Sequence, residues 1–170
     1  MNLDVVIRPE EHGDVGDIWQ VTKQAFAGRP YADGTEQDII NRLREQGALA
    51  ISLVAESRGR LVGHVAFSPA VPDDRSSGWY TLGPVSVEPA RQRHGIGKAL
   101  IREGIVRLRA RNAAGCIVVG DTNYYSQFGF VKAPALAPAI ELEEHFMILS
   151  LSGPAPSCKM DFHKAFYLEG

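Results

Sequence analysis

The stretch that decides the fold is Val85-Ser86-Val87-Glu88-Pro89-Ala90-Arg91-Gln92-Arg93-His94-Gly95-Ile96-Gly97-Lys98-Ala99-Leu100. It begins with the apolar character of a strand and ends in a helical pattern, so a loop with two glycines joins strand to helix. The amides of such a loop and of the first helical turn converge, and the helix dipole favours an anion there. Glycine lets the backbone approach a phosphate because it has no Cβ. The stretch predicts a phosphate-binding turn, to which Arg91, Arg93 and Lys98 add positive charge.

Two common phosphate-binding sequences do not fit this loop. A P-loop needs a glycine where Gln92 stands and a Ser or Thr where Ala99 stands. A dinucleotide fingerprint needs a third glycine where Leu100 stands. A pair of glycines alone is as consistent with a tight turn and close helix packing as with a phosphate-binding loop. The choice between the two depends on the elements that flank the loop.

The rest of the chain predicts strands and helices on both sides of this loop. Apolar runs and turn signals predict strands at residues 4–8, 48–56, 61–68, 79–87, 116–119, 130–131 and 146–151. Helical spacing predicts helices at residues 15–26, 95–112 and 122–128, and another with Ile39, Ile40 and Leu43 on its apolar face. Thr35-Glu36-Gln37-Asp38 has the form of a capping box before that helix, and Arg58-Gly59 is typical of a hairpin turn.

This order predicts an α+β (mixed α/β) fold. Strand 79–87, helix 95–112 and strand 116–119 form a βαβ crossover, whose strands are parallel, whereas the hairpin argues for an antiparallel remainder. Pro84 cannot donate to a sheet ladder, so it indicates a bulge or an interrupted edge within its strand. We expect one domain over residues 1–170, with a core at about 3–151 and a docked tail at 152–170.

Composition excludes several classes of protein. With 18 Lys and Arg against 20 Asp and Glu, the net charge is -2, which argues against a nucleic-acid partner. The apolar runs are far shorter than the ~20 residues of a membrane span, and no secretory signal is visible at the start, so we expect a cytoplasmic protein. Cys116 and Cys158 provide neither a disulfide framework nor metal-site spacing, and neither has the neighbourhood of a nucleophile.

Two motifs resemble those of a known family. Gln92-x-x-Gly95-x-Gly97, after a strand and Glu88-Pro89, resembles the Q/R-x-x-G-x-G/A motif of the GNAT superfamily of N-acetyltransferases. Residues 123–130, Asn-Tyr-Tyr-Ser-Gln-Phe-Gly-Phe, resemble its second motif, a tyrosine four residues before Gly-Phe. The resemblance covers about residues 3–151 and is strongest to a YhbS-like subgroup. It implies a twisted, mostly antiparallel sheet with one parallel splay that holds acetyl-CoA.

The resemblance also implies roles for individual residues. The pyrophosphate of coenzyme A would lie on the loop amides, and the pantetheine arm would pair with the backbone at Val85 and Val87. The implied cofactor-binding residues are Val85, Ser86, Val87, Gln92, Arg93, His94, Gly95, Ile96, Gly97, Lys98 and Asn123. Tyr125 would be the general acid that protonates the departing thiolate, and its neighbour Tyr124 is the alternative.

The general base is not specified by the sequence. Many family members place a glutamate on the bulged strand, but residues 79–87 contain no acid, and Glu88 follows them. Candidates to line the amine pocket are Tyr31, Asp33, Glu36 and His64. A structural histidine within a strand and a carboxylate in the first turn of a helix explain His64 and Glu36 equally well.

These observations predict an acetyl-CoA-dependent N-acetyltransferase that acts on a primary amine of a small molecule, peptide or protein by direct attack. The alternative is a non-catalytic acyl-CoA-binding module with the same fold, and a nucleotide-binding protein is a third reading. We expect no nucleic-acid, membrane or metal partner. A homodimer through the late strands is common in folds of this kind.

Overall fold

A computed structural model describes residues 4–139 and 143–167 of the chain. The chain divides into two compact units. Unit 1 comprises residues up to 67 together with 83–106, and unit 2 comprises 68–82 together with the residues from 107 onward. Strand β5 (Trp79–Val87) and helix α3 (Ile96–Ala110) each run from one unit into the other.

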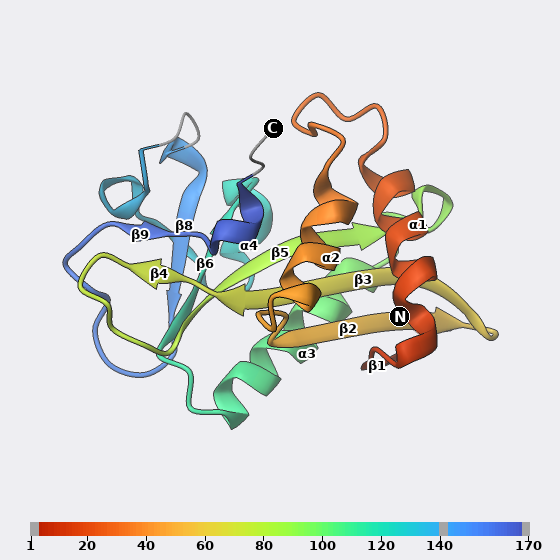
Figure 1. The fold of residues 1–170 in the computed structure, drawn as a ribbon, viewed down its shortest axis with the longest axis horizontal. Coiled ribbons are helices and arrows are strands. Elements are labelled where there is room, and N and C mark those ends of the chain that lie inside the picture. The colour runs from red at the N-terminus through yellow and green to blue at the C-terminus, as the bar shows by residue number, and fades with distance from the viewer. Residues whose placement is uncertain (1–3, 140–142, 168–170) are drawn as a thin grey trace. The chain divides into compact units, whose positions relative to one another are not determined.

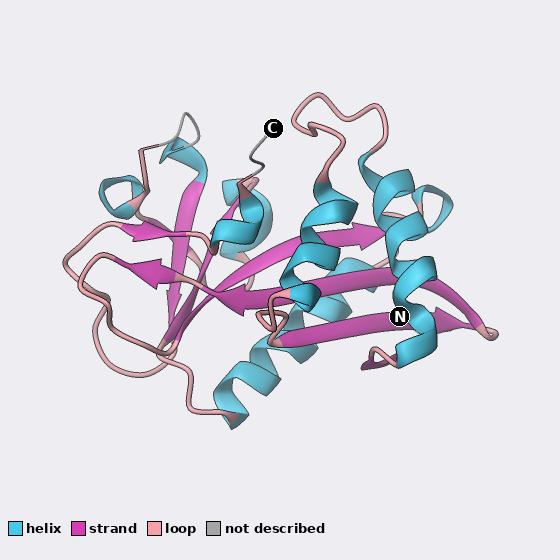
Figure 2. Cartoon of the chain, viewed as in Figure 1, coloured by secondary structure: helices cyan, strands magenta, loops and turns pink. Residues whose placement is uncertain are grey.

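The described strands form a seven-stranded sheet of order β1-β2-β3-β5-β6-β8-β7 and a separate pair, β4-β9 (Figures 1 and 2). The other strands are β1 (Val6–Pro9), β2 (Ile51–Ser57), β3 (Arg60–Pro69), β4 (Val71–Pro72), β6 (Gly115–Val119), β7 (Val131–Lys132), β8 (Phe146–Ser150) and β9 (Met160–Asp161). Strands β5 and β6 pair in parallel, and β1–β2, β2–β3, β6–β8 and β7–β8 pair antiparallel. The expected mixed fold with one βαβ crossover is confirmed.

The other helices also agree with the sequence. They are α1 (Val15–Phe26), α2 (Glu36–Glu45) and the short α4 (Thr122–Ser126). One detail is wrong: Thr35 makes no side-chain capping bond at the start of α2. Its amide and hydroxyl both donate to Asp33 Oδ1, so the local bonds of Thr35 are made with the residue two positions upstream and not with the helix.

In unit 1, helices cover both faces of the strands (Figure 1). Helices α1 and α2 bury Ile18 and Ile40 together with Val54 and Ala66 of the hairpin. Helix α3 packs on the other face, where a Cβ on Gly63 would lie only 3.1 Å from Leu100. Residues therefore alternate between two cores along β3, as strand geometry requires. The hairpin turn at 58–59 has positive φ at both residues, 52° and 77°, which suits the twist of the flanking strands.

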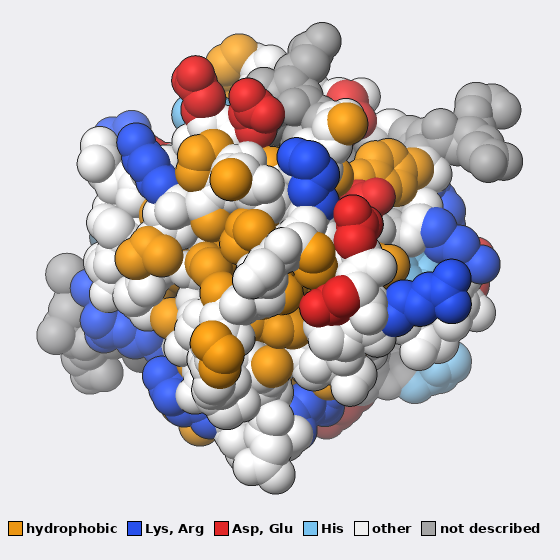
Figure 3. Space-filling model, turned by 90° about the vertical axis from the view of Figure 1, so that its left-hand side faces the viewer, with side chains coloured by type: hydrophobic (Ala, Val, Ile, Leu, Met, Phe, Trp, Pro, Cys, Tyr) orange, Lys and Arg blue, Asp and Glu red, His pale blue; other side chains and the backbone are white. Residues whose placement is uncertain are grey.

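In unit 2, one apolar cluster joins the sheet to the chain's tail. Trp79, Ile117 and Phe146 are buried together with Met160 of β9. Strand β9 pairs with β4, and the Phe162 and Phe166 rings lie 5.6 Å apart between centroids. The face of this unit in Figure 3 shows hydrophobic side chains gathered at its centre, with acidic and basic groups around them.

Parallel pairing is interrupted where Pro84 predicted it. The pairs of β5 with β6 run from Trp79–Gly115 to Thr81–Ile117, whereas β6 continues to pair with β8 as far as Val119. The peptide bond Gly83–Pro84 is cis, and Gly83 has a φ of 130°. Because the pairs with β6 end at Thr81, the second half of β5 has backbone groups that are not used in pairing with β6.

Helix α3 depends on a glycine at its contact with the sheet. A Cβ on Gly104 would lie 2.2 Å from a ring carbon of Phe67. We expect Gly104→Ala to lower the free energy of unfolding by about 1–3 kcal/mol through overpacking, although alanine is the better helix former. The matched control is Gly16→Ala in α1, where the Cβ meets nothing within 4 Å and should stabilise by up to about 1 kcal/mol. Urea unfolding measures both, and equal effects would contradict this reading.

A buried polar network joins the β2–β3 hairpin to Glu10 and to Arg44 of α2. His64 is 0% exposed, and its Nε2 lies 2.8 Å from Ser52 Oγ. The Ser52 hydroxyl donates to Glu10, which also accepts two N–H bonds from Arg44 at 2.9 and 3.0 Å. Burial opposes the charge of Glu10, but these hydrogen bonds outweigh it and lower the pKa of the carboxyl. Burial lowers the pKa of His64 to about 3, so its ring is neutral at physiological pH.

This network predicts a pH dependence of stability. The pKa of His64 is about 3 in the folded chain and near 6.5 when unfolded, so only the unfolded chain binds this proton between those values. Stability should therefore fall as the pH drops below 6.5, by about 2 kcal/mol at pH 5. His64→Gln should remove that part of the loss between pH 7 and pH 5 in urea titrations. The exposed His94→Gln is the control, and a parent-like loss in His64→Gln would refute the assignment.

Candidate functional site

The glycine loop of unit 1 is held by the side chain of Gln92. Its Nε2 donates to the carbonyl of Val87 at 3.0 Å, where β5 ends. Its Oε1 accepts a bond of 2.6 Å from the guanidinium of Arg29, in the segment that follows α1. The loop from β5 to α3 contains one 3-10 turn, Pro89–Arg91. A neutral amide carries both N–H donors and a carbonyl acceptor, so it can bridge these two partners and hold the path of the loop.

Backbone amides at the start of α3 are available where the sequence predicts an anion site. The amide of Ala99 donates to the Gly95 carbonyl at 3.0 Å, so the preceding amides of residues 95–98 lack an acceptor within the helix. Arg93 and Gly95 have φ values of 65° and 87°, a left-handed conformation that turns the chain into the helix. This geometry can bind a phosphate through several N–H groups at once.

The side chains around these amides add mostly positive charge. Arg93 and His94 are exposed, and Lys98 in the first turn of α3 is half-buried. Arg91 points back to β2, with its guanidinium 3.4 Å from Ser57 Oγ. Ile96 is buried and anchors the helix start in the core.

The strand that leads to the loop presents different groups on its two faces. Ser86 is buried, and its Oγ lies 3.2 Å from Thr22 Oγ1 of α1. Val85 and Val87 are half-buried and alternate with it, so they project to the opposite face. Ser86 can therefore meet a ligand only through its backbone.

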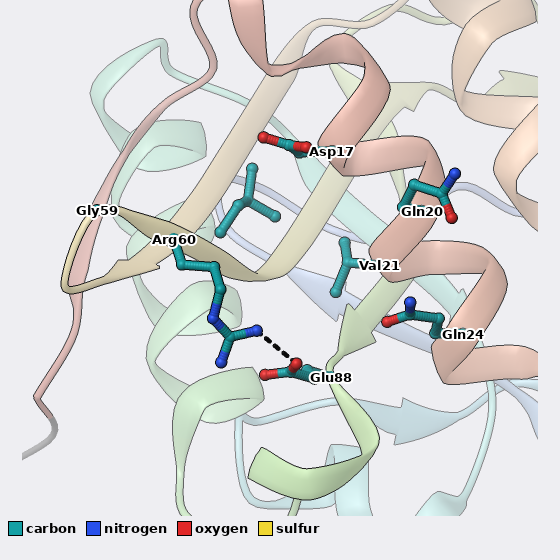
Figure 4. Close-up of a pocket in the computed structure, with 8 residues that line it drawn as sticks. Asp17, Gln20, Val21, Gln24, Gly59, Arg60 and Glu88 are labelled. Carbon is teal, nitrogen blue, oxygen red and sulfur yellow. Dashed lines mark hydrogen bonds and ion pairs between the residues drawn. The ribbon is translucent and has the colours of Figure 1, made fainter.

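A polar groove lies beside the exit of β5, with a volume of about 240 Å³ (Figure 4). One face of α1, the β2–β3 turn and Glu88 line it: Asp17, Gln20, Val21, Gln24, Gly59, Arg60, Leu61 and Glu88. Arg60 and Glu88 form an ion pair across it. The hydrogen bond from Arg60 lowers the pKa of Glu88, so this carboxylate is a weaker base than an isolated one.

In unit 2, the second motif forms the short helix α4. The Asp121 carboxylate caps it by accepting the amides of Asn123 and Tyr124 at 2.9 and 3.3 Å. Asn123 is exposed, and Tyr125 is half-buried with its ring centroid 5.9 Å from that of Phe130. The capping role of Asp121 was not among the predictions, although an aspartate before a short helix is a recognisable signal.

The position of the Tyr125 ring depends on the absence of a side chain at Gly120. A Cβ on Gly120 would lie 2.4 Å from the Tyr125 ring, so only glycine leaves room for this rotamer. Tyr124 is 37% exposed, and its ring centroid lies 5.0 Å from that of Tyr125. Partial burial raises the pKa of Tyr124. The contact of Gly120 with Tyr125 could not be read from spacing, because the strand and the helix have to be placed first.

The four candidates for the amine pocket differ in their exposure and in their hydrogen bonds. Tyr31 is 74% exposed and meets Phe26 edge-on at 6.3 Å. Hydrogen bonds from Thr35 lower the pKa of Asp33, and its amide donates to Glu36 Oε2 at 3.2 Å. The other oxygen of Glu36 is buried and has no hydrogen-bond partner among the described residues. His64 lies in the interior network, out of reach of solvent, so its side chain does not line a pocket open to a substrate.

Other reactive groups add nothing to this site. Burial raises the pKa of the Cys116 thiol, which disfavours a thiolate nucleophile. Within residues 4–139 and 143–167, no group of three or more His, Cys, Asp or Glu side chains could hold a metal ion. None of the helices in that part of the chain is long and apolar enough to cross a membrane.

Comparison with known proteins gives consistent results. The model of the acetyltransferase (GNAT) family matches residues 15–130. The uncharacterised N-acetyltransferase YhbS of Escherichia coli K12 is 32% identical over 110 residues, which cover 64% of this chain and 66% of that protein. The match thus spans slightly less than two thirds of the length of this curated relative.

Two solved structures resemble the chain over nearly its whole length. One is a GNAT family acetyltransferase from Brucella melitensis in complex with acetyl-CoA, 43% identical, with a TM-score of 0.86, and the match covers 96% of this chain and 98% of that one. The other is YhbS from E. coli in complex with CoA, 26% identical, with a TM-score of 0.88 over 100% and 96% of the two chains. The chain therefore belongs to the acetyltransferase (GNAT) family.

Proposed function

We propose that the protein transfers an acetyl group from acetyl-CoA to a primary amine. The observation that carries this is the loop fixed by Gln92, which leads the chain into the free amides at the start of α3. These amides would bind the pyrophosphate, with Arg93, His94 and Lys98 around it. The backbone at Val85 and Val87, which lies beyond the residues that pair with β6, would receive the pantetheine arm. The complexes of the two similar proteins with acetyl-CoA and CoA support this assignment.

The proposed reaction needs no covalent enzyme intermediate. The amine nitrogen attacks the thioester carbonyl carbon, a C–N bond forms, and the C–S bond breaks. The departing thiolate takes the phenolic proton of Tyr125, and the amine proton passes to a base or to water. A thiol pKa of ~8.5 and a tyrosine pKa of ~10 make this transfer reasonable. Asn123 would lie near the cofactor.

The acceptor is proposed to be cationic before it loses its proton. Asp33 and the unpartnered oxygen of Glu36 offer negative charge, and Tyr31 offers an exposed aromatic face. A small amine or an amine of a peptide or protein would suit these groups equally.

One observation favours a second candidate, a module that binds acyl-CoA without transfer. Residues 79–87 contain no acid, and the ion pair with Arg60 weakens Glu88 as a base. Thiol release from acetyl-CoA, measured against a panel of amines, polyamines, aminoglycosides and peptides, separates the two. Turnover with any of them supports the transferase, and binding without turnover across the panel favours the module.

Acetyl-CoA binding should stabilise the fold. At 100 times its dissociation constant, a ligand adds ~2.7 kcal/mol, so the melting temperature should rise by several degrees. Gly97→Val should abolish this shift, because a branched side chain obstructs the amides. Gly16→Val is the matched control, since both glycines are the second residue of their helix. A folded parent whose melting curve ignores millimolar acetyl-CoA would refute the site.

Tyr125→Phe tests the general acid. The change keeps the ring, so folding and acetyl-CoA affinity should stay close to those of the parent. The chemical step should slow by ~100–10,000-fold, and the loss should appear in kcat rather than KM. Tyr124→Phe should be mild. A fast Tyr125→Phe beside an inactive Tyr124→Phe would move the role to Tyr124, and two active variants would show that no tyrosine acid is needed.

A further inference from the structure

Arg29 is a cation beside the glycine loop that belongs to neither sequence motif. It lies in the exposed segment after α1, and its guanidinium donates to Gln92 Oε1 at 2.6 Å. Its backbone is fixed as well, because its amide donates to the Phe26 carbonyl and its carbonyl accepts from Ala32, both at 3.1 Å. Turn and side chain together hold the guanidinium against the loop.

The charge of Arg29 is not neutralised within the described chain. Arg8, Arg44 and Arg60 each form an ion pair with a carboxylate at 3.0 Å or less. Arg29 contacts a neutral amide, and no carboxylate among residues 4–139 and 143–167 lies within ion-pair distance of it. Its single described bond also uses only one of its five N–H donors. Charge and donors therefore remain for an anionic ligand.

We infer that Arg29 binds a phosphate group of the bound coenzyme A, from outside the glycine loop. This inference rests on the proposed function. Gln92 joins Arg29 to the loop whose amides would bind the same anion, and it orients the guanidinium through its second bond to the Val87 carbonyl. An arginine fork suits phosphate oxygens because it donates two parallel bonds. The same segment, residues 27–35, then contributes to both substrates: Arg29 to the donor, and Tyr31 and Asp33 to the acceptor.

The test compares CoA with pantetheine, which carries no phosphate. Calorimetry of the full chain should show CoA binding to Arg29→Gln about 5- to 10-fold more weakly than to the parent, as for an exposed charge-assisted contact. Arg29→Lys should stay within about three-fold of the parent, because it keeps the charge and loses the fork. Pantetheine, titrated at millimolar concentration by NMR, should bind all three proteins alike. The loss in Arg29→Gln should shrink as salt is added.

Arg109→Gln is the matched control, since it removes the same charge from an exposed position in the last turn of α3. It should bind CoA like the parent. CoA binding to Arg29→Gln at parental strength would overturn the inference. An equal loss for CoA and pantetheine would also overturn it, because Arg29 would then act through loop shape alone. A parent that does not bind CoA would instead contradict the proposed function itself.

Discussion

The two hydrogen bonds of the Gln92 side chain are the constraint on which the site depends. One bond closes the loop onto the Val87 carbonyl, and the other joins it to Arg29. Without them the turn from strand to helix would have to hold its path through backbone bonds alone, such as the 2.8 Å bond from the Arg91 amide to the Glu88 carbonyl. The positive φ values at Arg93 and Gly95 then direct the first amides of α3 outward. A site made of backbone donors has to be held in this way, because their positions are set only by the path of the chain.

Strand β5 gives this loop its starting point. Its parallel pairing ends at Thr81, and its second half carries Ser86 toward α1 and the two valines toward the other face. Hydrophobic packing and ligand contacts are thereby assigned to different parts of one strand. The buried contact of Ser86 with Thr22 holds this half of the strand against α1. A one-residue slip would reverse every side chain.

The carboxylates of unit 1 divide into two kinds. Glu10 and Glu88 hold arginines, and their lowered pKa values reflect these bonds. Glu36 differs, because it forms no ion pair among the described residues. One oxygen of Glu36 and one of Glu88 are buried without a hydrogen-bond partner in the described chain. A carboxylate oxygen in that condition is costly unless a ligand or water supplies a donor. Glu88 has the ion pair with Arg60 to hold its carboxylate, whereas Glu36 has no cationic partner in the described chain.

The sequence by itself determined the elements of the fold, the glycine loop and the two motifs. These signals are local: strand and helix periodicity, Gly95 and Gly97 at the strand-to-helix turn, and Pro84 within a strand. It could not determine that His64 is buried beside Ser52, that Asp33 accepts bonds from the amide and hydroxyl of Thr35, or that Gly120 makes room for Tyr125. The link from Arg29 to Gln92 joins residues 63 positions apart. Only the tertiary structure decides such contacts, because side-chain partners across a fold depend on register and packing, which no local pattern encodes.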